Sequence, residues 1–281
     1  MAAGAALVLV ATPIGNMGDL APRAAQELSA ADVIACEDTR RTARLLALAG
    51  IAPKDLLAVN EHNEAEAAPS LVARIRCGER VVYVTDAGTP GIADPGERLV
   101  RAAADAGCAV TVVPGPSAPL AAVAASGLTS GRFVYEGFLP RRGASRAARL
   151  AELAASERAV VLLEAPHRCE RTGRELAESF GPERRVAAAR ELTKLHEEIW
   201  RGTLGGLAAW AEAGVRGEVV LVIEGAPPPV PPTDADIRAA LTEERAAAPD
   251  SSVRDITSTV AGRLGVSRRH VYEQARRVDL T

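Results

Sequence analysis

The sequence predicts an α/β protein with two domains of alternating strands and helices, followed by a small helical appendix. Short apolar runs alternate with longer segments of helical period from the first residues onward, which is typical of βα units and a parallel sheet. The length of 281 residues also suits two α/β domains better than one. The expected divisions are a first domain at residues 1–116, a second at 117–226, a proline-rich linker at 227–233 and the appendix at 234–281.

The first domain contains four short apolar runs that we expect to be strands. These runs lie at residues 7–11, 33–36, 80–85 and 110–113, and helices are expected at 22–30, 39–49, 70–76 and 96–106. Gly50 and Gly107 follow two of the helices, at the position where a left-handed glycine commonly ends a helix. The strands end at loops rich in Gly, Pro, Asp and Thr. Because ligands bind beyond the carboxyl ends of the strands in open parallel sheets, these loops are the expected site.

The second domain continues the alternation. Strands are expected at residues 133–137, 159–163, 185–189 and 219–224, and helices at 118–125, 144–155, 172–180 and through Trp210. The proline-rich composition of the linker predicts a stiff, extended segment. Helices at 234–243, 252–264 and 267–277 then form the appendix. Gly265 and Ser267 supply a helix stop and an N-cap there, which gives a helix-turn-helix outline.

The charge balance excludes a general nucleic-acid binder. There are 33 basic and 36 acidic side chains and a net charge of -3, so any RNA or DNA must be held by local patches. The apolar start of the chain has no basic segment before it, and no run approaches about 18 apolar residues, so we expect neither a signal peptide nor a membrane span. We expect a soluble cytoplasmic protein whose four widely spaced cysteines are buried free thiols.

Several common catalytic motifs are absent from the sequence. There is no G-x-x-x-x-G-K-[ST] or G-x-G-x-x-G phosphate loop and no G-x-S-x-G nucleophile turn. The histidines form no H-x-x-x-H pair and the cysteines no C-x-x-C pair, so the usual ligand sets of metal enzymes are missing. The sequence therefore disfavours nucleoside triphosphate, dinucleotide and metal chemistry.

What remains is a set of unusual strand-end loops. In the first domain they are TPIGN (12–16), EDTR (37–40), DAGTPGIADPG (86–96) and VPGPSA (113–118). Pro13 fixes the backbone and Gly15 lets it approach a ligand closely. The third loop offers a rigid backbone surface suited to an adenosine-type ligand, with a carboxylate for ribose hydroxyls or a cation. Taken singly, the other three also fit a βα turn, a helix cap with an ion pair, and a rigid linker.

Further loops of this kind follow in the second domain. They are GFLP (137–140), E-x-PHR (164–168), ARELTK (189–194) and RGE (216–218). Any one of these clusters fits a solvated loop better than a site. Their joint occurrence at strand boundaries favours a site.

Taken in order, these eight motifs resemble those of the tetrapyrrole methylase superfamily, and within it the ribosomal RNA small subunit methyltransferase I branch. The match runs from about Leu7 to Gly225, and the helical appendix also fits that branch. Two departures are minor: Ala165-Pro166 within the PHR loop, and Arg216 where the family motif often begins with lysine. The second departure keeps a cation but changes its geometry.

The resemblance implies two α/β domains with S-adenosylmethionine in the cleft between them, and a homodimer. It implies transfer of the methyl group to the 2′-hydroxyl of a cytidine, cytidine 1402, in the decoding region of 16S ribosomal RNA in the small ribosomal subunit. We expect no DNA partner, no membrane association and no metal ligand, and the sequence leaves open whether a metal assists. The alternatives are a methylase of the same fold that acts on a small molecule or a protein, and a non-enzymatic protein that reads DNA with its helix-turn-helix.

The site residues follow from the positions of the motifs. The residues expected to hold the cofactor are Ile14, Gly15, Asp86, Ala87, Gly88, Thr89, Pro90, Ser117, Ala118, Ala165, Leu192, Thr193 and Glu218. The resemblance identifies no general base, and the candidates are Glu37, Glu164, His167 and Lys194. Lys194 is one of only two lysines, and a buried lysine can act as a base. A phosphate contact or an ion pair with Glu191 is an equally good interpretation.

Arginines gather in two later segments that could contact RNA. Residues 132–149 hold five arginines and one acid, and residues 254–277 hold six arginines and two acids. Both segments also fit ordinary solvated faces of an arginine-rich protein. The residues expected to contact RNA are Arg40, Arg141, Arg142, Arg146, Arg168, Arg268 and Arg269.

Overall fold

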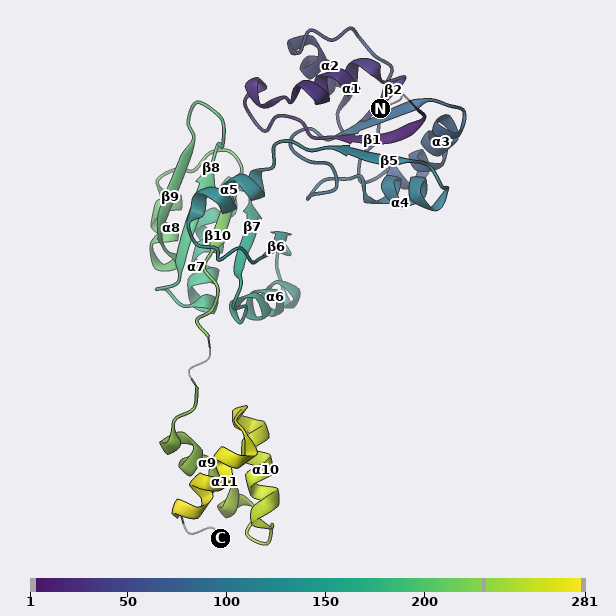
Figure 1. Cartoon of the computed structure of the whole chain (residues 1–281). Helices are drawn as coiled ribbons and strands as arrows, with labels where there is room; N and C mark the ends of the chain where they lie inside the picture. Colours follow the sequence, from purple (N-terminus) through teal and green to yellow (C-terminus); the bar gives the residue numbers. More distant parts are fainter. Residues whose placement is uncertain (1–3, 229–230, 279–281) are drawn as a thin grey trace. The chain divides into compact units, whose positions relative to one another are not determined.

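The computed structural model describes residues 4–228 and 231–278, which form two compact units (Figure 1). The first unit runs to Ala226 and contains two five-stranded sheets, and the second begins at Pro227 and contains three helices. Each unit is described by itself. Positions 229–230 of the expected linker lie outside the described residues.

The first sheet is entirely parallel, with strand order β3-β2-β4-β1-β5. Its strands are β1 (Ala6–Val10), β2 (Val33–Cys36), β3 (Leu56–Ala58), β4 (Arg80–Val84) and β5 (Val110–Val113). The predicted strands and the parallel arrangement are confirmed here. The three-residue β3 was not expected, because so short and half-exposed a segment carries no alternating pattern.

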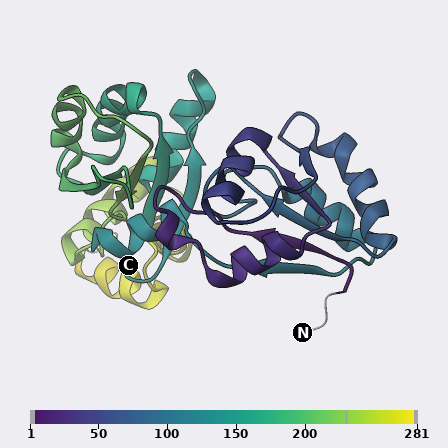
Figure 2. The same cartoon turned by 90° about the horizontal axis from the view of Figure 1, so that it is seen from above.

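Helices cover both faces of this sheet (Figures 1 and 2). Helices α1 (Pro22–Ala30) and α2 (Thr39–Leu48) lie on one face, and α3 (Glu64–Arg76) and α4 (Glu97–Asp105) lie on the other. A short 3-10 helix at Met17–Asp19 precedes α1. Successive residues of a strand point to opposite faces of the sheet and so contribute to two hydrophobic cores. Val8 packs with α1 and α2, and Leu7 packs with α3 and α4. Helix α3 begins earlier than expected and includes Pro69, which lies in its second turn.

The second sheet is mixed, with order β6-β7-β10-β8-β9. Its strands are β6 (Phe133–Phe138), β7 (Ala159–Glu164), β8 (Arg185–Arg190), β9 (Glu198–Thr203) and β10 (Val219–Ile223). Only β6 and β7 pair in parallel, so the expectation of a parallel sheet is wrong for this half. The loop between β8 and β9 is too short for the crossover that parallel strands need, and the two form an antiparallel hairpin.

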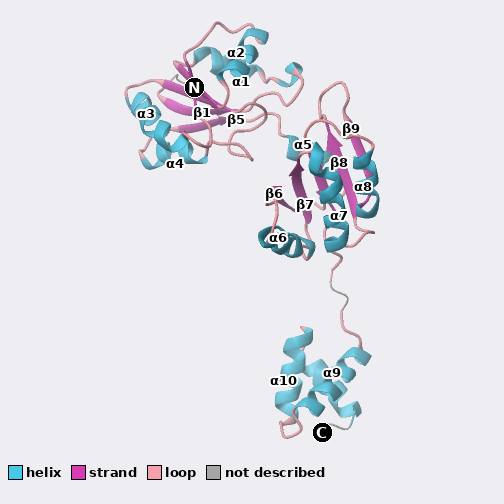
Figure 3. Cartoon of the chain, turned by 180° about the vertical axis from the view of Figure 1, so that it is seen from behind, coloured by secondary structure: helices cyan, strands magenta, loops and turns pink. Residues whose placement is uncertain are grey.

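Helices also line both faces of the second sheet (Figure 3). One core is built with α6 (Ala144–Ala154), α7 (Cys169–Phe180) and α8 (Leu204–Glu212), and the other with α5 (Ala118–Ser126). A short 3-10 helix at Pro166–Arg168 precedes α7. Strand β10 lies at the centre of the sheet and every one of its residues is buried.

The second unit is a three-helix assembly with its own core. Its helices are α9 (Asp234–Ala247), α10 (Val253–Leu264) and α11 (Arg268–Ala275), followed by a 3-10 turn at Arg276–Val278. Side chains of Thr233, Ser252 and Ser267 cap the three helix starts, and Gly265 ends α10 in the left-handed conformation. The predicted helix-turn-helix outline of α10 and α11 is confirmed, whereas α9 is longer than expected.

The cysteines are all free, and their burial differs. Cys36 and Cys169 are buried, Cys108 is half-buried and Cys77 is exposed, so the expectation of buried thiols is wrong for Cys77. Among the residues that the structure describes, no helix has both the length and the apolar character to cross a membrane.

A buried carboxylate orders the start of α4, next to the loop after β4. The N-cap residue Gly96 has φ of 136° and carries no side chain to cap the helix. Glu64 of α3, 4% exposed, accepts hydrogen bonds from the N–H groups of Gly96 at 3.1 Å and Leu99 at 2.9 Å. A carboxylate at this position satisfies two unpaired donors and complements the helix dipole.

Replacing this carboxylate tests its contribution. We expect Glu64→Ala to lower the free energy of unfolding by about 2–3 kcal/mol, because two buried N–H groups lose a charged partner. The matched control is Glu66→Ala, an exposed carboxylate in the same first turn of α3, which we expect to change stability by less than about 0.5 kcal/mol. Urea unfolding measures both, and equal stabilities for the two variants would contradict the capping role.

Candidate functional site

Three loops of the first sheet are tied together beyond the carboxyl ends of β1, β4 and β5. Thr12 and Gly88 form a backbone bridge, with N–H to oxygen distances of 2.9 and 3.0 Å in the two directions. The hydroxyl of Thr89 donates to the carbonyl of Pro116 at 3.1 Å. These bonds make one continuous surface from three segments that are far apart in the sequence.

The loops of the second sheet also meet at one edge. Val219, the first residue of β10, pairs with Glu164 at the end of β7 and with Arg190 at the end of β8. Because β10 runs antiparallel to both neighbours, Glu218 lies at the edge where the loops after β7 and β8 begin. The RGE motif comes before β10, whereas the E-x-PHR and ARELTK motifs come at the ends of β7 and β8. Because β10 runs in the opposite direction, all three motifs lie at the same edge of the sheet.

The loop after β1 contacts the loop after β8. A Cβ on Gly15 would lie 2.4 Å from Cγ of Lys194 and 3.0 Å from Oγ1 of Thr193, so only glycine allows this approach. Ile14 packs against the cluster that contains Leu192. The structure therefore brings together Ile14, Gly15, Leu192 and Thr193, four of the expected cofactor residues.

The remaining expected cofactor residues lie on the same loops. Asp86 to Pro90 follow β4, Ser117 and Ala118 begin α5, Ala165 follows β7 and Glu218 precedes β10. Thr12, which sequence reasoning did not select, bonds directly to this set through Gly88.

These loops also hold strained backbone and unpartnered polar atoms. The non-glycine residues with positive φ within the described ranges are Ala93, Glu191 and Thr193, at 65°, 51° and 66°, and all three lie in these loops. The buried side-chain atoms without a hydrogen-bond partner in the same ranges are Oη of Tyr135, Nε of Arg168 and Oγ1 of Thr193. Strain and free polar groups concentrate where a polar ligand would bind.

A group of carboxylates comes from three loops of the two sheets. Burial raises the pKa of Asp94 to about 7, and the negative charges of Glu37, Glu218 and Asp86 add to this effect. Burial and the charge of Asp86 also raise the pKa of Glu37. Asp94 was not singled out from the sequence, where only its position in a glycine- and proline-rich loop distinguishes it. No set of three or more His, Cys, Asp or Glu side chains in the described residues is arranged to hold a metal ion.

Tyr135 of β6 was also missed by sequence reasoning. Burial raises the pKa of its hydroxyl, and the charge of Asp94 contributes to the increase. A single tyrosine in an apolar strand gives no sequence signal of a site. The pairing of β6 with β7 and the meeting of loops from the two sheets bring its hydroxyl close enough for the charge of Asp94 to act on it.

The EDTR segment is a helix cap. Asp38 accepts from the N–H of Arg40 at 2.8 Å and forms an ion pair with its guanidinium at 2.9 Å, which lowers the pKa of Asp38 to about 2. Arg41 pairs with Asp86 at 3.1 Å. The cap interpretation is confirmed for Asp38, and the Arg40 side chain remains largely exposed.

Glu164 lies in a buried polar network and is only 2% exposed. Its Oε1 accepts from the N–H of Ala165 at 2.8 Å and pairs with Arg168 at 2.7 Å. Its Oε2 accepts from the hydroxyl of Thr172 at 2.7 Å and lies 3.9 Å from Arg146. Both oxygens are engaged, and this carboxylate orders the loop after β7; its role as a general base stays a prediction.

Arg146 does not fit its expected role in RNA contact. Its side chain is 4% exposed and donates to Glu175 at 2.7 Å, to the carbonyl of Pro140 at 2.9 Å and to Thr172 at 2.8 Å. It lies on the buried face of α6, and from sequence it could not be separated from the exposed arginines around it. Arg168 is likewise committed to Glu164.

The other two candidate bases are placed differently. Lys194 is 41% exposed and its ammonium pairs with Glu191 at 2.8 Å, which matches the ion-pair interpretation. Glu191 in turn lies against Gly217, where a Cβ would come within 1.9 Å of its Oε1. His167 is exposed on the 3-10 helix before α7.

The remaining expected RNA contacts are exposed. Arg141 and Arg142 lie in the turn before α6, and Arg268 and Arg269 begin α11. Arg269 pairs with Glu273 at 3.1 Å.

A family model and several named relatives show to which family the chain belongs. The model of the tetrapyrrole (corrin/porphyrin) methylases matches residues 6–208. Proteins named ribosomal RNA small subunit methyltransferase I are similar to the chain: that of Mycobacterium tuberculosis is 43% identical over 95% of this chain and 93% of its own length. That of Synechocystis is 46% identical over 79% of this chain and 80% of its own length.

Solved structures share the fold. The methyltransferase CobJ has a TM-score of 0.61 and 22% identity, covering 79% of this chain and 94% of its own. Uroporphyrin-III C-methyltransferase from Thermus thermophilus, in complex with S-adenosyl homocysteine, has a TM-score of 0.56 and 22% identity, covering 78% of this chain and 97% of its own.

The buried position of Arg146 leads to a stability prediction. We expect Arg146→Ala to lower the free energy of unfolding by about 3 kcal/mol, because Glu164 and Glu175 lose a buried partner. Arg142→Ala, four residues away and exposed, is the control and should change stability by less than about 0.5 kcal/mol. Denaturant unfolding compares them, and a stable Arg146→Ala protein would contradict a structural role.

The raised pKa of Asp94 makes stability depend on pH. The folded protein holds this proton up to about pH 7 whereas the unfolded chain releases it near pH 4, so Asp94 lowers stability increasingly as pH rises through this window. We expect Asp94→Asn to be stabilising, and by about 1 kcal/mol more at pH 8 than at pH 5 after allowance for solvent screening. Urea unfolding at the two pH values measures this difference, and a gain independent of pH would refute the assignment.

Proposed function

The chain belongs to the tetrapyrrole methylase family, and from this premise we propose that it transfers the methyl group of S-adenosylmethionine to the 2′-hydroxyl of cytidine 1402 in 16S ribosomal RNA. The observation that carries the proposal is the similarity, over nearly the whole chain, to relatives named ribosomal RNA small subunit methyltransferase I. The structural neighbours named uroporphyrin-III C-methyltransferase and cobalt precorrin-4 methyltransferase are more distant in sequence and share the fold.

The loops described above fit this cofactor. Buried polar atoms without partners, Oη of Tyr135 and Oγ1 of Thr193, are available to a polar ligand. In the loop after β4, Gly88 carries no side chain and offers the close approach that a nucleoside needs, whereas Gly15 holds the loop after β1 against the loop after β8. We assign cofactor binding to these loops and to the residues at the start of α5, after β7 and β8 and before β10.

Methyl transfer to oxygen needs positioning and a proton acceptor. S-adenosylmethionine supplies an electrophilic methyl group on a sulfonium sulfur. The ribose oxygen forms a bond to the methyl carbon as the carbon–sulfur bond breaks, and the hydroxyl proton passes to a carboxylate. We assign this acceptor to Asp94, whose pKa burial raises to about 7, with Glu37 as the second candidate because burial and the charge of Asp86 raise its pKa too. Rigid loops then provide the in-line geometry that accelerates the step.

The exposed arginines are the proposed contacts of the RNA backbone. Arg40, Arg141, Arg142, Arg268 and Arg269 are accessible to phosphates. A homodimer and a cytoplasmic location complete the proposal. Sedimentation of the purified protein tests the first, and cell fractionation the second.

Gly15 gives a direct test of the cofactor site. We expect Gly15→Ala to weaken S-adenosylmethionine binding by about tenfold or more, because its Cβ would force apart the loops that contact each other at Lys194. Gly262→Ala is the control, since a Cβ there meets open space on α10. Calorimetric titration measures both affinities. Wild-type affinity in the Gly15 variant would contradict this placement of the cofactor.

Mapping of the methylated nucleotide tests the function itself. We expect RNA from a strain lacking the protein to have an unmodified ribose at cytidine 1402, and purified protein with labelled S-adenosylmethionine to restore methylation of small ribosomal subunits. A parallel reaction with a tetrapyrrole extract tests the small-molecule alternative. A fully methylated cytidine in the deletion strain would overturn the proposal.

A further inference from the structure

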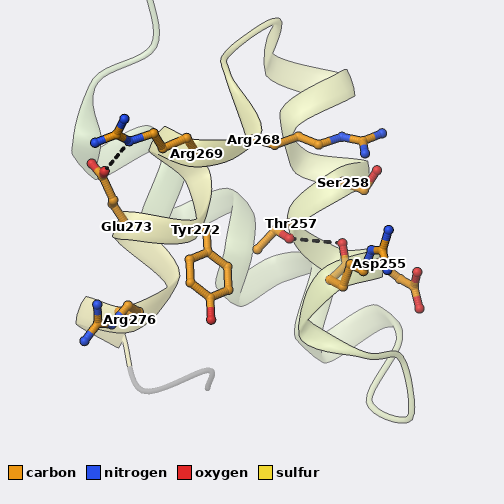
Figure 4. Close-up of a pocket in the computed structure, with 9 residues that line it drawn as sticks. Asp255, Thr257, Ser258, Arg268, Arg269, Tyr272, Glu273 and Arg276 are labelled. Carbon is orange, nitrogen blue, oxygen red and sulfur yellow. Dashed lines mark hydrogen bonds and ion pairs between the residues drawn. The ribbon is translucent and has the colours of Figure 1, made fainter.

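The second unit contains a hollow between α10 and α11 that is rich in arginine (Figure 4). Arg254, Arg268 and Arg276 line it and are exposed. Most arginines of the first unit pair with a carboxylate or a carbonyl, whereas no hydrogen bond or ion pair involves the side chains of these three within residues 231–278. Three uncompensated cations around one hollow create a local positive potential in a protein whose net charge is negative.

The acidic residues of the hollow offset these cations only in part. Asp255 accepts a hydrogen bond from the hydroxyl of Ser252 at 2.6 Å, within the N-terminal cap of α10. Glu273 pairs with Arg269 at 3.1 Å, one helical turn along α11. Arg269 therefore compensates Glu273, and the three unpaired guanidinium groups outnumber the one remaining carboxylate, Asp255.

The hollow also offers an aromatic ring and a hydroxyl. Tyr272 is 48% exposed, and in Figure 4 its ring projects from α11 into the space between the two helices. Arg268 extends from α11 toward Ser258 on α10 in the same view. An exposed ring beside unpaired guanidinium groups is the combination that stacks a base and holds its phosphates.

We propose that this hollow binds single-stranded RNA, with a base stacked on Tyr272 and the adjoining phosphates held by Arg254, Arg268 and Arg276. The ring favours a single strand, because the bases of a duplex are already stacked on each other. The choice of RNA rests on the proposed function. The hollow adds affinity for RNA.

The test uses the full chain and a single-stranded oligouridylate as probe. We expect the triple variant Arg254→Ala, Arg268→Ala, Arg276→Ala to bind the probe at least about tenfold more weakly at 0.1 M salt. The slope of log K against log salt should fall by about 2, for three phosphates lost from a single strand. Tyr272→Ala should weaken binding by about fivefold or more without changing the slope, and Tyr272→Phe should restore it. The affinity for S-adenosylmethionine should not change in any of these variants.

A second triple variant controls for net charge. Arg44, Arg98 and Arg158 are exposed, lie in the first unit and take part in no side-chain hydrogen bond or ion pair of the described residues, so their joint replacement by alanine removes the same charge. It should leave probe affinity within about twofold of the wild type. An equal loss in both triple variants would overturn the proposal, as would wild-type affinity and slope in the first. The Tyr272→Ala and Tyr272→Phe pair decides the question if the first triple variant does not fold.

Two further outcomes separate this proposal from the proposed function. Tighter binding of the wild type to duplex DNA than to the probe, lost in the first triple variant, would show a DNA reader and overturn the RNA proposal. Probe binding that depends on the three arginines, in a protein that methylates no cytidine, would overturn the proposed function alone. Methylation by the wild type with unchanged probe binding in the first triple variant would overturn this inference alone.

Discussion

The direction of β10 is the constraint on which the candidate site depends. This strand is buried along its whole length at the centre of the second sheet and runs antiparallel to β7 and β8. Its first residue therefore lies beside the last residues of both neighbours, and Glu218 joins the loops that follow them. A parallel β10 would have placed the RGE motif at the opposite edge. The five apolar side chains of β10 alternate between the hydrophobic cores on the two faces of the sheet, and their burial keeps the strand in this position.

Close contacts between loops then join the two sheets within the first unit. Gly15, after β1, faces the stem of Lys194 and so links the first sheet to the second, whereas Gly217 faces Glu191 within the loops of the second sheet. Lys194 and Glu191 pair with each other, so one ion pair bridges both glycines. Backbone with positive φ at Glu191 and Thr193 lies in the same segment. Such strain persists only where surrounding contacts impose it, and here they also keep polar atoms available for a ligand.

The arginines divide into two groups that composition alone could not separate. Arg146 and Arg168 are bound to Glu164 in a buried network that orders the loop after β7. Arg141, Arg142 and Arg268 are exposed. The net charge of -3 is thus a sum over arginines paired with carboxylates in the fold, cations that are free to meet phosphate, and a larger number of other carboxylates.

The sequence by itself determined the helices, the parallel first sheet, the appendix and the segments that make the site, because apolar periodicity, caps and turn residues are local signals. It also determined the family through eight ordered motifs. Tertiary structure alone decided the direction of β10, the burial of Arg146, the hydrogen bonds of Glu164 and Glu64, and the environments of Asp94 and Tyr135. All of these properties depend on which residues from distant segments come within a few ångströms of each other. Burial and neighbouring charges then determine the hydrogen bonds and the pKa of each side chain. No local pattern records such proximity.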